Sequence, residues 1–240
     1  MTSAQITVAV TGASGALGRA LLQRWHHRGA RLVAISHSSA PLQLHDCAGA
    51  LIPLQQLTWQ VGQEQSLLAE LGTVDLLVLN HGVNLQKQRN AEATARSLEV
   101  NALSSWRLLE GFAALAASRS EAERTARPRP EVWINTSEAE IEPAFSPLYE
   151  ISKRLLGQLL SLRSLDLARA VRIRRLVLGP FRSALNPVGV MPVGFVADQV
   201  LLQASLGCNL ILVTPNPLIY VMMPLTTLSR WLYNMLLTRA

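Results

Sequence analysis

Cysteine and long apolar runs are scarce in this 240-residue chain. The two cysteines, Cys47 and Cys208, provide neither a disulfide framework nor the ligand spacing of a metal site. No segment has 18 or more uninterrupted apolar residues, which argues against a membrane-spanning helix. The first residues lack the basic segment and long apolar stretch of a signal peptide. These absences predict a cytoplasmic protein that binds no metal ion.

Charge is also sparse, and it is unbalanced. Charged residues make up 16% of the chain and hydrophobic residues 49%, so the chain can bury a large core. The formal net charge is +6, and lysine occurs only at Lys87 and Lys153 among 22 basic residues. This excess suits an anionic cofactor or an acidic membrane surface. Nucleic acid is not an expected partner, because no basic run is interleaved with aromatic residues.

Short β-branched runs alternate with longer helical patterns along the chain. The expected strands are Ile6–Thr11, Arg31–Ser36, Ala50–Pro53, Val74–Asn80, Val132–Ser137, Arg172–Leu178 and Asn209–Val213. The expected helices are Ala16–Arg28, Glu64–Leu71, Ala91–Ser118, Leu148–Ala170 and Val196–Leu206. Ser118–Glu131, with mixed charges and two prolines, is expected to be a solvated loop. The alternation predicts a single α/β domain over 1–240, a Rossmann-like doubly wound parallel sheet with helices on both faces. Residues 209–240 are an apolar C-terminal extension of that domain.

The segment "TGASGALG", Thr11–Gly18, joins the first strand to the first helix. A tight strand-to-helix turn presents free backbone N–H groups and the positive end of the helix dipole, which together suit a diphosphate. Gly12 allows the turn, Gly15 the approach of the phosphate and Gly18 close helix packing. The predicted cofactor-binding residues here are Gly12, Ser14, Gly15, Ala16, Leu17 and Gly18.

The end of the second strand indicates which dinucleotide binds. A carboxylate about 20 residues after the turn favours NAD, because it accepts a hydrogen bond from the ribose 2′-hydroxyl. Ser36, His37 and Ser38 occupy that place, with Arg19 nearby in the sequence. Because no carboxylate is present to repel a 2′-phosphate, the sequence favours NADP over NAD.

Tyr149 and Lys153 stand four residues apart on an expected helix, so they share one face. An isolated tyrosine has a pKa near 10 and is a poor proton carrier at neutral pH. A neighbouring ammonium would favour the phenolate and lower that pKa. The two residues could therefore move a proton at a carbonyl or alcohol oxygen.

These features, taken in order, resemble those of the short-chain dehydrogenase/reductase family over nearly the whole chain. The landmarks are the glycine turn, "NHG" (Asn80, His81, Gly82) where the family often has N-A-G, Asn101 in "LEVNALS", Ser137 in "WINTS", and then Tyr149 and Lys153. Two departures are Ala16, where the shorter-chain type often has glycine, and Gly179-Pro180, the reverse of a frequent Pro-Gly. The match is thus to a shorter-chain member with an atypical glycine motif.

The resemblance implies an enzyme that moves a hydride between a nicotinamide and a substrate carbon. Tyr149 would exchange the proton, Lys153 would hold the nicotinamide ribose and lower the tyrosine pKa, and Ser137 would hydrogen-bond the substrate oxygen. Thr136 is a rival to Ser137. Asn101 would position a water in a proton relay. The further cofactor-pocket residues are Asn80, His81, Gly82 and Pro180.

We therefore expect an NADP(H)-dependent carbonyl reductase or alcohol dehydrogenase that acts on a small-molecule carbonyl or alcohol, with a lipophilic substrate as one option. A homodimer or homotetramer is the expected assembly. Two rivals stay open. One is an extended-type relative acting on a nucleotide-linked sugar, and the other is a dinucleotide-sensing regulator without turnover.

The last residues carry an apolar stripe at helical spacing. Its members are Leu225, Leu228, Trp231, Leu232, Met235 and Leu236. The residues Arg230, Asn234 and Arg239 lie off the stripe. The stripe could cover the core or substrate cleft, form a subunit interface, or lie on a membrane surface as a peripheral contact. The sequence leaves these three alternatives open.

Overall fold

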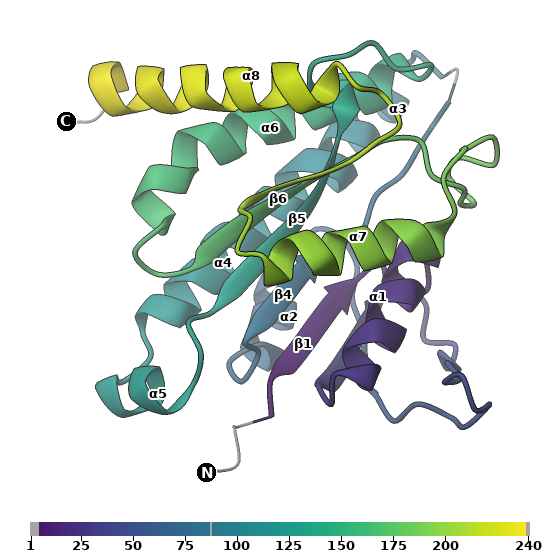
Figure 1. Ribbon diagram of the computed structural model, residues 1–240, viewed down its shortest axis with the longest axis vertical. Helices are drawn as coiled ribbons and strands as arrows, with labels where there is room; N and C mark the ends of the chain where they lie inside the picture. The colour runs from purple at the N-terminus through teal and green to yellow at the C-terminus, as the bar shows by residue number, and fades with distance from the viewer. Residues whose placement is uncertain (1–4, 87, 239–240) are drawn as a thin grey trace.

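A parallel seven-stranded sheet organises the part of the chain that the computed structural model describes, residues 5–86 and 88–238 (Figure 1). Its strand order is β3-β2-β1-β4-β5-β6-β7, which confirms the predicted doubly wound fold. The strands are β1 (Thr7–Thr11), β2 (Arg31–Ser36), β3 (Gln55–Thr58), β4 (Leu76–Leu79), β5 (Glu131–Ser137), β6 (Arg172–Leu178) and β7 (Leu210–Val213). The order reverses between β1 and β4, so the crevice beyond the carboxyl ends of these strands is where ligands of such folds bind.

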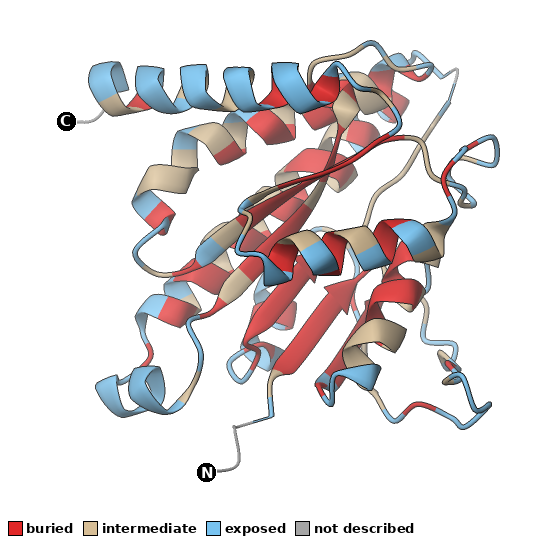
Figure 2. Cartoon of the chain, in the orientation of Figure 1, coloured by how far each residue is buried: buried red, intermediate tan, exposed pale blue. Residues whose placement is uncertain are grey.

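Helices cover both faces of the sheet. The α-helices are α1 (Ala16–His27), α2 (Glu64–Glu70), α3 (Ala91–Leu98), α4 (Ser104–Ala117), α5 (Glu121–Ala126), α6 (Pro147–Leu167), α7 (Val193–Ser205) and α8 (Ile219–Tyr233). The apolar faces of α1 and α7 pack on one side of the sheet, and those of α2, α4 and α6 on the other. The central strands are buried on both faces (Figure 2), which is why β1 and β4 are almost continuously apolar in sequence.

The strand predicted at Ala50–Pro53 is wrong, because β3 lies a few residues later at Gln55–Thr58. Leu51 makes only an isolated antiparallel bridge to His45, while Ile52 packs into the core. β3 is an edge strand with one neighbour, so it tolerates the polar sequence Q-Q-L-T. An apolar run was therefore a poor guide to this strand.

Two helical predictions also need correction. The expected loop Ser118–Glu131 contains α5, whose first turn is closed by a capping box between Ser120 and Glu123. The single helix predicted over Ala91–Ser118 is interrupted by a π-helical segment, Glu99–Leu103, between α3 and α4. This wider turn surrounds Asn101, a predicted site residue.

The C-terminal stripe faces outward, which disfavours the first of the three alternatives, that it covers the core or substrate cleft. Its exposed members are Leu225, Leu228, Trp231, Leu232 and Leu236, whereas Met235 is half-buried. The buried residues of this segment are Ile219 and Met223 at the start of α8 and Asn234 after its end. Figure 2 shows the long exposed side of α8. Arg239 lies outside the described residues.

Candidate functional site

The glycine turn follows β1 and has a shape that side chains would obstruct. Gly12 has φ +61°, and a Cβ there would lie 2.9 Å from the Asn80 carbonyl oxygen. A Cβ on Gly18 would lie 2.4 Å from the Gly12 carbonyl oxygen, so α1 packs directly on the turn. Gly15 caps α1 in an extended conformation and donates its N–H to the Gly12 carbonyl oxygen (3.0 Å). The turn is thus a backbone cradle at a helix N-terminus, which fits a dinucleotide diphosphate.

The side chains of this turn differ in their surroundings. Ser14 is exposed at the tip, and Ala16 is half-buried in the first residue of α1. Leu17 is buried in the core under the sheet, so only its backbone faces the turn. The atypical methyl group of Ala16 therefore adds bulk to the first helical position and leaves the backbone of the cradle intact.

The end of β2 presents hydroxyl groups and no carboxylate. The buried Ser36 hydroxyl donates to the Ser38 carbonyl oxygen (2.7 Å), and the Ser38 hydroxyl accepts from the Ala40 N–H (3.1 Å). His37 between them is exposed. Arg19 on α1 donates to the Gln43 carbonyl oxygen (2.9 Å), in the loop that follows. This end of the site therefore contains donors and a nearby guanidinium.

The end of β4 is organised by Thr11, which our sequence analysis did not include in the site. The Thr11 hydroxyl accepts from the Asn80 N–H (2.9 Å), lies 2.8 Å from His81 Nδ1 and is 3.2 Å from the Val78 carbonyl oxygen. The sequence signal for Thr11 was its place as the first residue of "TGASGALG". Because one hydroxyl holds both β4 residues, the glycine turn and the "NHG" segment form one unit.

His81 fills the position where alanine was expected. Its Nε2 lies 2.8 Å from the Ser104 hydroxyl, and its ring meets the edge of Trp59 at 5.0 Å between centroids. Burial, reinforced by the charge of Lys153, lowers the pKa of His81 to about 3. The imidazole is therefore neutral at physiological pH, and its position indicates a role in holding α4 against the β4 loop.

Asn101 is fully buried in the π-helical segment. Its Oδ1 accepts the Val83 N–H (2.7 Å), and its Nδ2 donates to the Val83 carbonyl oxygen (2.9 Å) and to the Ser152 hydroxyl (3.0 Å). Gly82 lies so close that a Cβ there would be 3.1 Å from Asn101 Oδ1. Asn101 therefore joins three elements: the helix between α3 and α4, the loop after β4, and α6.

Ser137 and Tyr149 meet at the carboxyl end of β5. Ser137 is the last residue of the strand, and its hydroxyl lies near enough to the phenol of Tyr149, at the start of α6, to affect the pKa of that phenol. Ser137 Oγ also accepts the Ala139 N–H (3.2 Å). The hydroxyl of Thr136 donates instead to the Leu176 carbonyl oxygen of β6 (3.2 Å) inside the sheet. The alternation of side chains along β5 thus gives Ser137, and not Thr136, access to the tyrosine.

The pKa of Tyr149 differs from our expectation that Lys153 lowers it. Burial raises the pKa of the Tyr149 phenol, the nearby Ser137 hydroxyl acts in the opposite direction, and the negative charge of Glu138 raises it further. Lys153 Nζ lies 5.6 Å from the centre of the Tyr149 ring, where it contacts the π face and not the hydroxyl. Burial of Lys153 lowers its own pKa to about 8.

Asn135 is a residue of the site that sequence reasoning missed. The Lys153 ammonium donates to its carbonyl oxygen (2.9 Å), and Asn135 Nδ2 donates to Asn80 Oδ1 (2.9 Å). Asn80 Nδ2 in turn lies 3.5 Å from the Gly12 carbonyl oxygen. The sequence signal for Asn135 was its amide side chain at the end of the otherwise apolar segment "VWIN". These contacts connect the glycine turn to Lys153, so the predicted site residues on β1, β4, β5 and α6 come together.

Two groups of predicted residues lie outside this connected set. Ser36 ends β2 and His37 and Ser38 follow it, and β2 lies on the far side of β1 from β5 and is thus farther from Tyr149. Pro180, after β6, uses its carbonyl oxygen to accept the Val190 N–H (2.9 Å) in its own loop. The positions of these four residues suit contacts with the ends of an extended ligand better than contacts with its reacting atoms.

A buried carboxylate lies just beyond the site. Glu140, three residues after Ser137, has a fully buried side chain 3.5 Å from Arg175 of β6 and 3.6 Å from Arg230 of α8. A Cβ on Gly157 of α6 would lie 1.8 Å from Glu140 Oε2. The Glu140 carboxylate therefore ties the segment after Ser137 to α6, β6 and α8.

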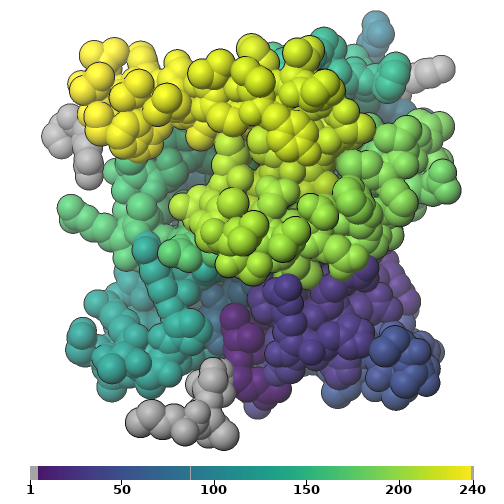
Figure 3. Space-filling view, viewed as in Figure 1, coloured from purple at the N-terminus to yellow at the C-terminus, as the bar shows by residue number. Residues whose placement is uncertain are grey.

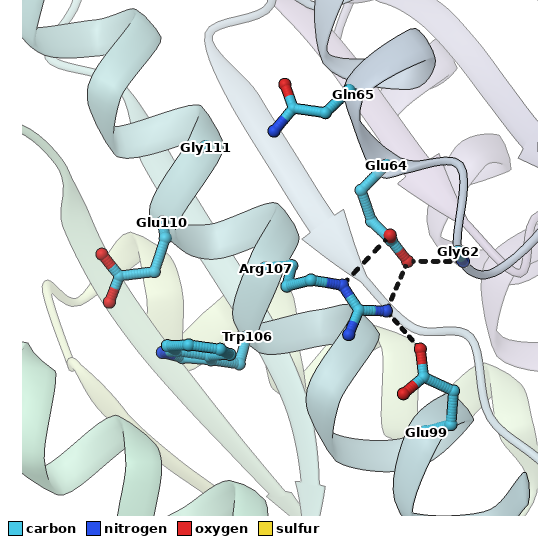
Figure 4. A pocket seen from close by; sticks show the side chains of 8 residues that line it. All are labelled: Gly62, Glu64, Gln65, Glu99, Trp106, Arg107, Glu110 and Gly111. Atoms are coloured by element: carbon cyan, nitrogen blue, oxygen red, sulfur yellow. Dashed lines mark hydrogen bonds and ion pairs between the residues drawn. The ribbon is translucent and has the colours of Figure 1, made fainter.

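A pocket between α2 and α4 lies apart from the connected site residues on β1, β4, β5 and α6 (Figure 4). Arg107 bridges Glu64 (3.1 Å) and Glu99 across it, and Trp106 and Glu110 also line it. None of its lining residues belongs to the predicted site. In the described part of the chain, no group of three or more His, Cys, Asp or Glu side chains could hold a metal ion.

Comparison with known proteins agrees with this geometry. The short chain dehydrogenase family matches residues 6–187. A Synechocystis sp. protein named "Monoglucosyldiacylglycerol epimerase" is 44% identical over 218 residues, which are 90% of this chain and 51% of that protein. The chain thus spans about half the length of this relative.

Two solved structures share the fold. A short-chain dehydrogenase from Sphingobium yanoikuyae in complex with NADPH has a TM-score of 0.76 at 18% identity, covering 98% of this chain and 97% of that one. A short chain dehydrogenase from Burkholderia cenocepacia in complex with NADP has a TM-score of 0.73 at 20% identity and full coverage of both chains. The protein belongs to the short-chain dehydrogenase family.

Proposed function

We propose that the protein interconverts an alcohol and its carbonyl by NADP(H)-dependent hydride transfer, with Tyr149 as the proton donor and acceptor. The contact between Tyr149 and Ser137 at the carboxyl end of β5 carries this proposal. It places two hydroxyl groups where a substrate oxygen could contact both. The bound nicotinamide would supply or accept the hydride.

Tyr149 suits the reduction direction at neutral pH. Because burial raises its pKa, the phenol keeps its proton and can donate it to a developing alkoxide. Ser137 would hydrogen-bond the same oxygen and stabilise its charge. Lys153 would hold the nicotinamide ribose from the floor of the site, where its ammonium is anchored on Asn135. In the oxidation direction, Tyr149 would take the alcohol proton, and this step would be favoured at high pH.

The dinucleotide is proposed to be NADP(H). The cradle at Gly12, Gly15 and Gly18 fits the diphosphate, and a side chain at Gly12 or Gly18 would collide with the surrounding backbone. The end of β2 has no carboxylate to repel a 2′-phosphate, and Arg19 lies one turn into α1. The NADP and NADPH complexes of the two structural relatives support the same choice.

A second candidate activity is epimerisation of a sugar carbinol on a glycolipid. The 44% identity to the lipid-sugar epimerase favours it, and it replaces the nucleotide-linked sugar that we considered from the sequence. Inversion at a carbinol carbon would pass its hydride to bound NADP⁺ and its hydroxyl proton to a base, and would then return the hydride to the opposite face of the resulting ketone and the proton to the same oxygen. Tyr149 could perform both proton transfers, and the net reaction would consume no reductant.

The test combines binding and turnover in the full chain. We expect NADP⁺ to raise the melting temperature more than NAD⁺ does. We expect Tyr149→Phe to lower kcat by roughly 10²–10⁴-fold while cofactor stabilisation is kept. Tyr233→Phe is the matched control, because this tyrosine is exposed on α8. Unchanged turnover in Tyr149→Phe would refute the mechanism.

Stoichiometry separates the two activities. A reductase consumes one NADPH for each ketone reduced. An epimerase converts monoglucosyldiacylglycerol with only catalytic NADP(H), and sugar analysis of the product shows the inverted centre. Stabilisation by NADP⁺ without turnover on ketones, aldehydes or the glycolipid would instead favour the regulator considered above.

A further inference from the structure

Helix α8 is oriented with polar groups toward the protein and apolar groups toward solvent. Arg230 points inward to Glu140, and Asn234, just after the helix, donates to the Ser161 carbonyl oxygen of α6 (2.9 Å). Only the first turns bury apolar side chains, at Ile219 and Met223. A helix that covers a core normally has the reverse arrangement. The apolar side of α8 is therefore available to something other than its own domain.

The outward face is a continuous aliphatic row. Val221, Leu225, Leu228 and Leu232 follow at helical spacing, and each is between 39% and 58% exposed. Trp231 and the two tyrosines of α8, Tyr220 and Tyr233, flank this row and are also exposed. Figure 3 shows α8 as a ridge along one edge of the molecule. Arg230 is the only charged residue between positions 219 and 233, and its side chain points inward to Glu140.

Exposed apolar residues continue from α8 toward the site. Leu218 precedes α8 in the loop after β7, and Phe145 is fully exposed four residues before Tyr149. Val188 and Val190 are exposed in the loop after β6. All three loops leave the carboxyl end of the sheet, where the site lies. Exposed apolar residues therefore occur both on α8 and on the loops around the predicted substrate entrance.

We propose that this outward face of α8 docks on an anionic lipid bilayer. No acidic residue occurs after Asp198, so nothing on α8 repels a negative surface, and the chain has a net charge of +6. Exposed tryptophan and tyrosine beside aliphatic residues suit the headgroup boundary. No helix in the described residues is long and apolar enough to cross a membrane, so α8 would lie in the plane of the surface.

A second copy of the chain is the competing occupant. Protein interfaces carry about one hydrogen bond per 100–200 Å² and a polar rim. The outward row of α8 offers aliphatic groups and has no charged side chain. This chemistry fits fluid acyl chains better than a partner that must be held in one orientation. The inference rests on α8 itself and does not require the proposed catalytic function.

The test is flotation of the full chain with vesicles of phosphatidylcholine alone or mixed with phosphatidylglycerol. We expect binding to the anionic vesicles and at least a tenfold lower partition coefficient for Leu228→Glu/Leu232→Glu. The matched control is Leu202→Glu/Leu206→Glu, in α7 and at its C-terminal cap, because α7 covers the other side of the sheet and both leucines are exposed. Melting temperatures of both variants check folding, because all four side chains are exposed.

A second readout follows Trp231 with brominated lipids. Quenching of tryptophan fluorescence should fall in Trp231→Phe, because the other tryptophans lie outside α8. The proposal is overturned if the wild-type chain ignores both vesicles or if the α8 variant binds as well as the wild type. It is also overturned if light scattering shows a wild-type dimer that the α8 variant splits, without any change in vesicle binding.

Discussion

Arg230→Met should destabilise the protein through the buried carboxylate of Glu140. Removing one partner of a buried ion pair typically costs about 3–5 kcal/mol, because the other charge stays buried. Here Arg175 remains 3.5 Å from Glu140, and the Arg230 side chain is 18% exposed, so we expect a smaller loss, about 2 kcal/mol. Methionine keeps the apolar stem of the arginine. In a chain of this size the loss corresponds to about 4–8 °C in melting temperature.

The matched control is Arg154→Met. Arg154 pairs with Glu150 at 3.0 Å, a shorter distance than the 3.6 Å of the Arg230 pair, but Arg154 is 43% exposed. Exposed pairs one helical turn apart contribute about 0.3–0.5 kcal/mol, so this variant should melt within about 2 °C of the wild type. Thermal unfolding followed by circular dichroism measures both. Equal shifts in the two variants would refute the argument that burial, and not distance, sets the strength of these pairs.

Three further outcomes are expected. In the reduction direction, kcat/KM for NADPH should fall as pH rises through about 8. The reason is that Lys153 loses its proton there, while the raised pKa of Tyr149 keeps the phenol protonated. Lys153→Arg should move this fall to higher pH. A fall at the same pH in that variant would show that another group titrates. Because the pKa of His81 is depressed to about 3, the folded state binds fewer protons than the unfolded state below pH 6.5, so stability should decrease as pH falls from 6.5 toward 3. In His81→Ala, the free energy of unfolding measured with urea should differ less between pH 7 and pH 5 than in the wild type, although the variant should be less stable at pH 7. Equal differences in the two proteins would contradict the assignment to His81. Gly18→Ala, whose Cβ would lie 2.4 Å from a backbone oxygen, should lower NADP⁺ affinity more than tenfold by titration, whereas Gly15→Ala, at 3.2 Å, should change it less.

The sequence predicted the sheet and the main landmarks of the site because each has a local cause. Gly12 needs a left-handed φ, and Tyr149 and Lys153 are one helical turn apart, so neither depends on distant parts of the chain. β1 and β4 are apolar because both of their faces are covered. The roles assigned to Tyr149, Lys153, Ser137 and Asn101 remain predictions.

Other features depend on contacts that a sequence pattern does not contain. Asn135 joins the site only because β5 lies beside β4 and under α6. The pKa of Tyr149 is raised by burial and by the charge of Glu138. Lys153, one turn further along α6, is not among the groups that shift it. The stripe on α8 has the spacing of a core helix, yet Glu140 and Ser161 bind the polar side of that helix. Periodicity identified the apolar face correctly and gave no information on which direction it points.

The amide of Asn101 serves as a substitute for a peptide unit. By accepting from the N–H of Val83 and donating to its carbonyl oxygen, it pairs with that loop residue as the backbone of a neighbouring strand would. Only a primary amide can provide both halves of this pairing, so Asn101→Asp loses every donor and places a charge at a site without solvent access. The loop after β4 rests against the glycine turn through Asn80 and Thr11. Replacing Asn101 is therefore expected to weaken cofactor binding by releasing this loop, even if the substituted residue never takes part in proton transfer.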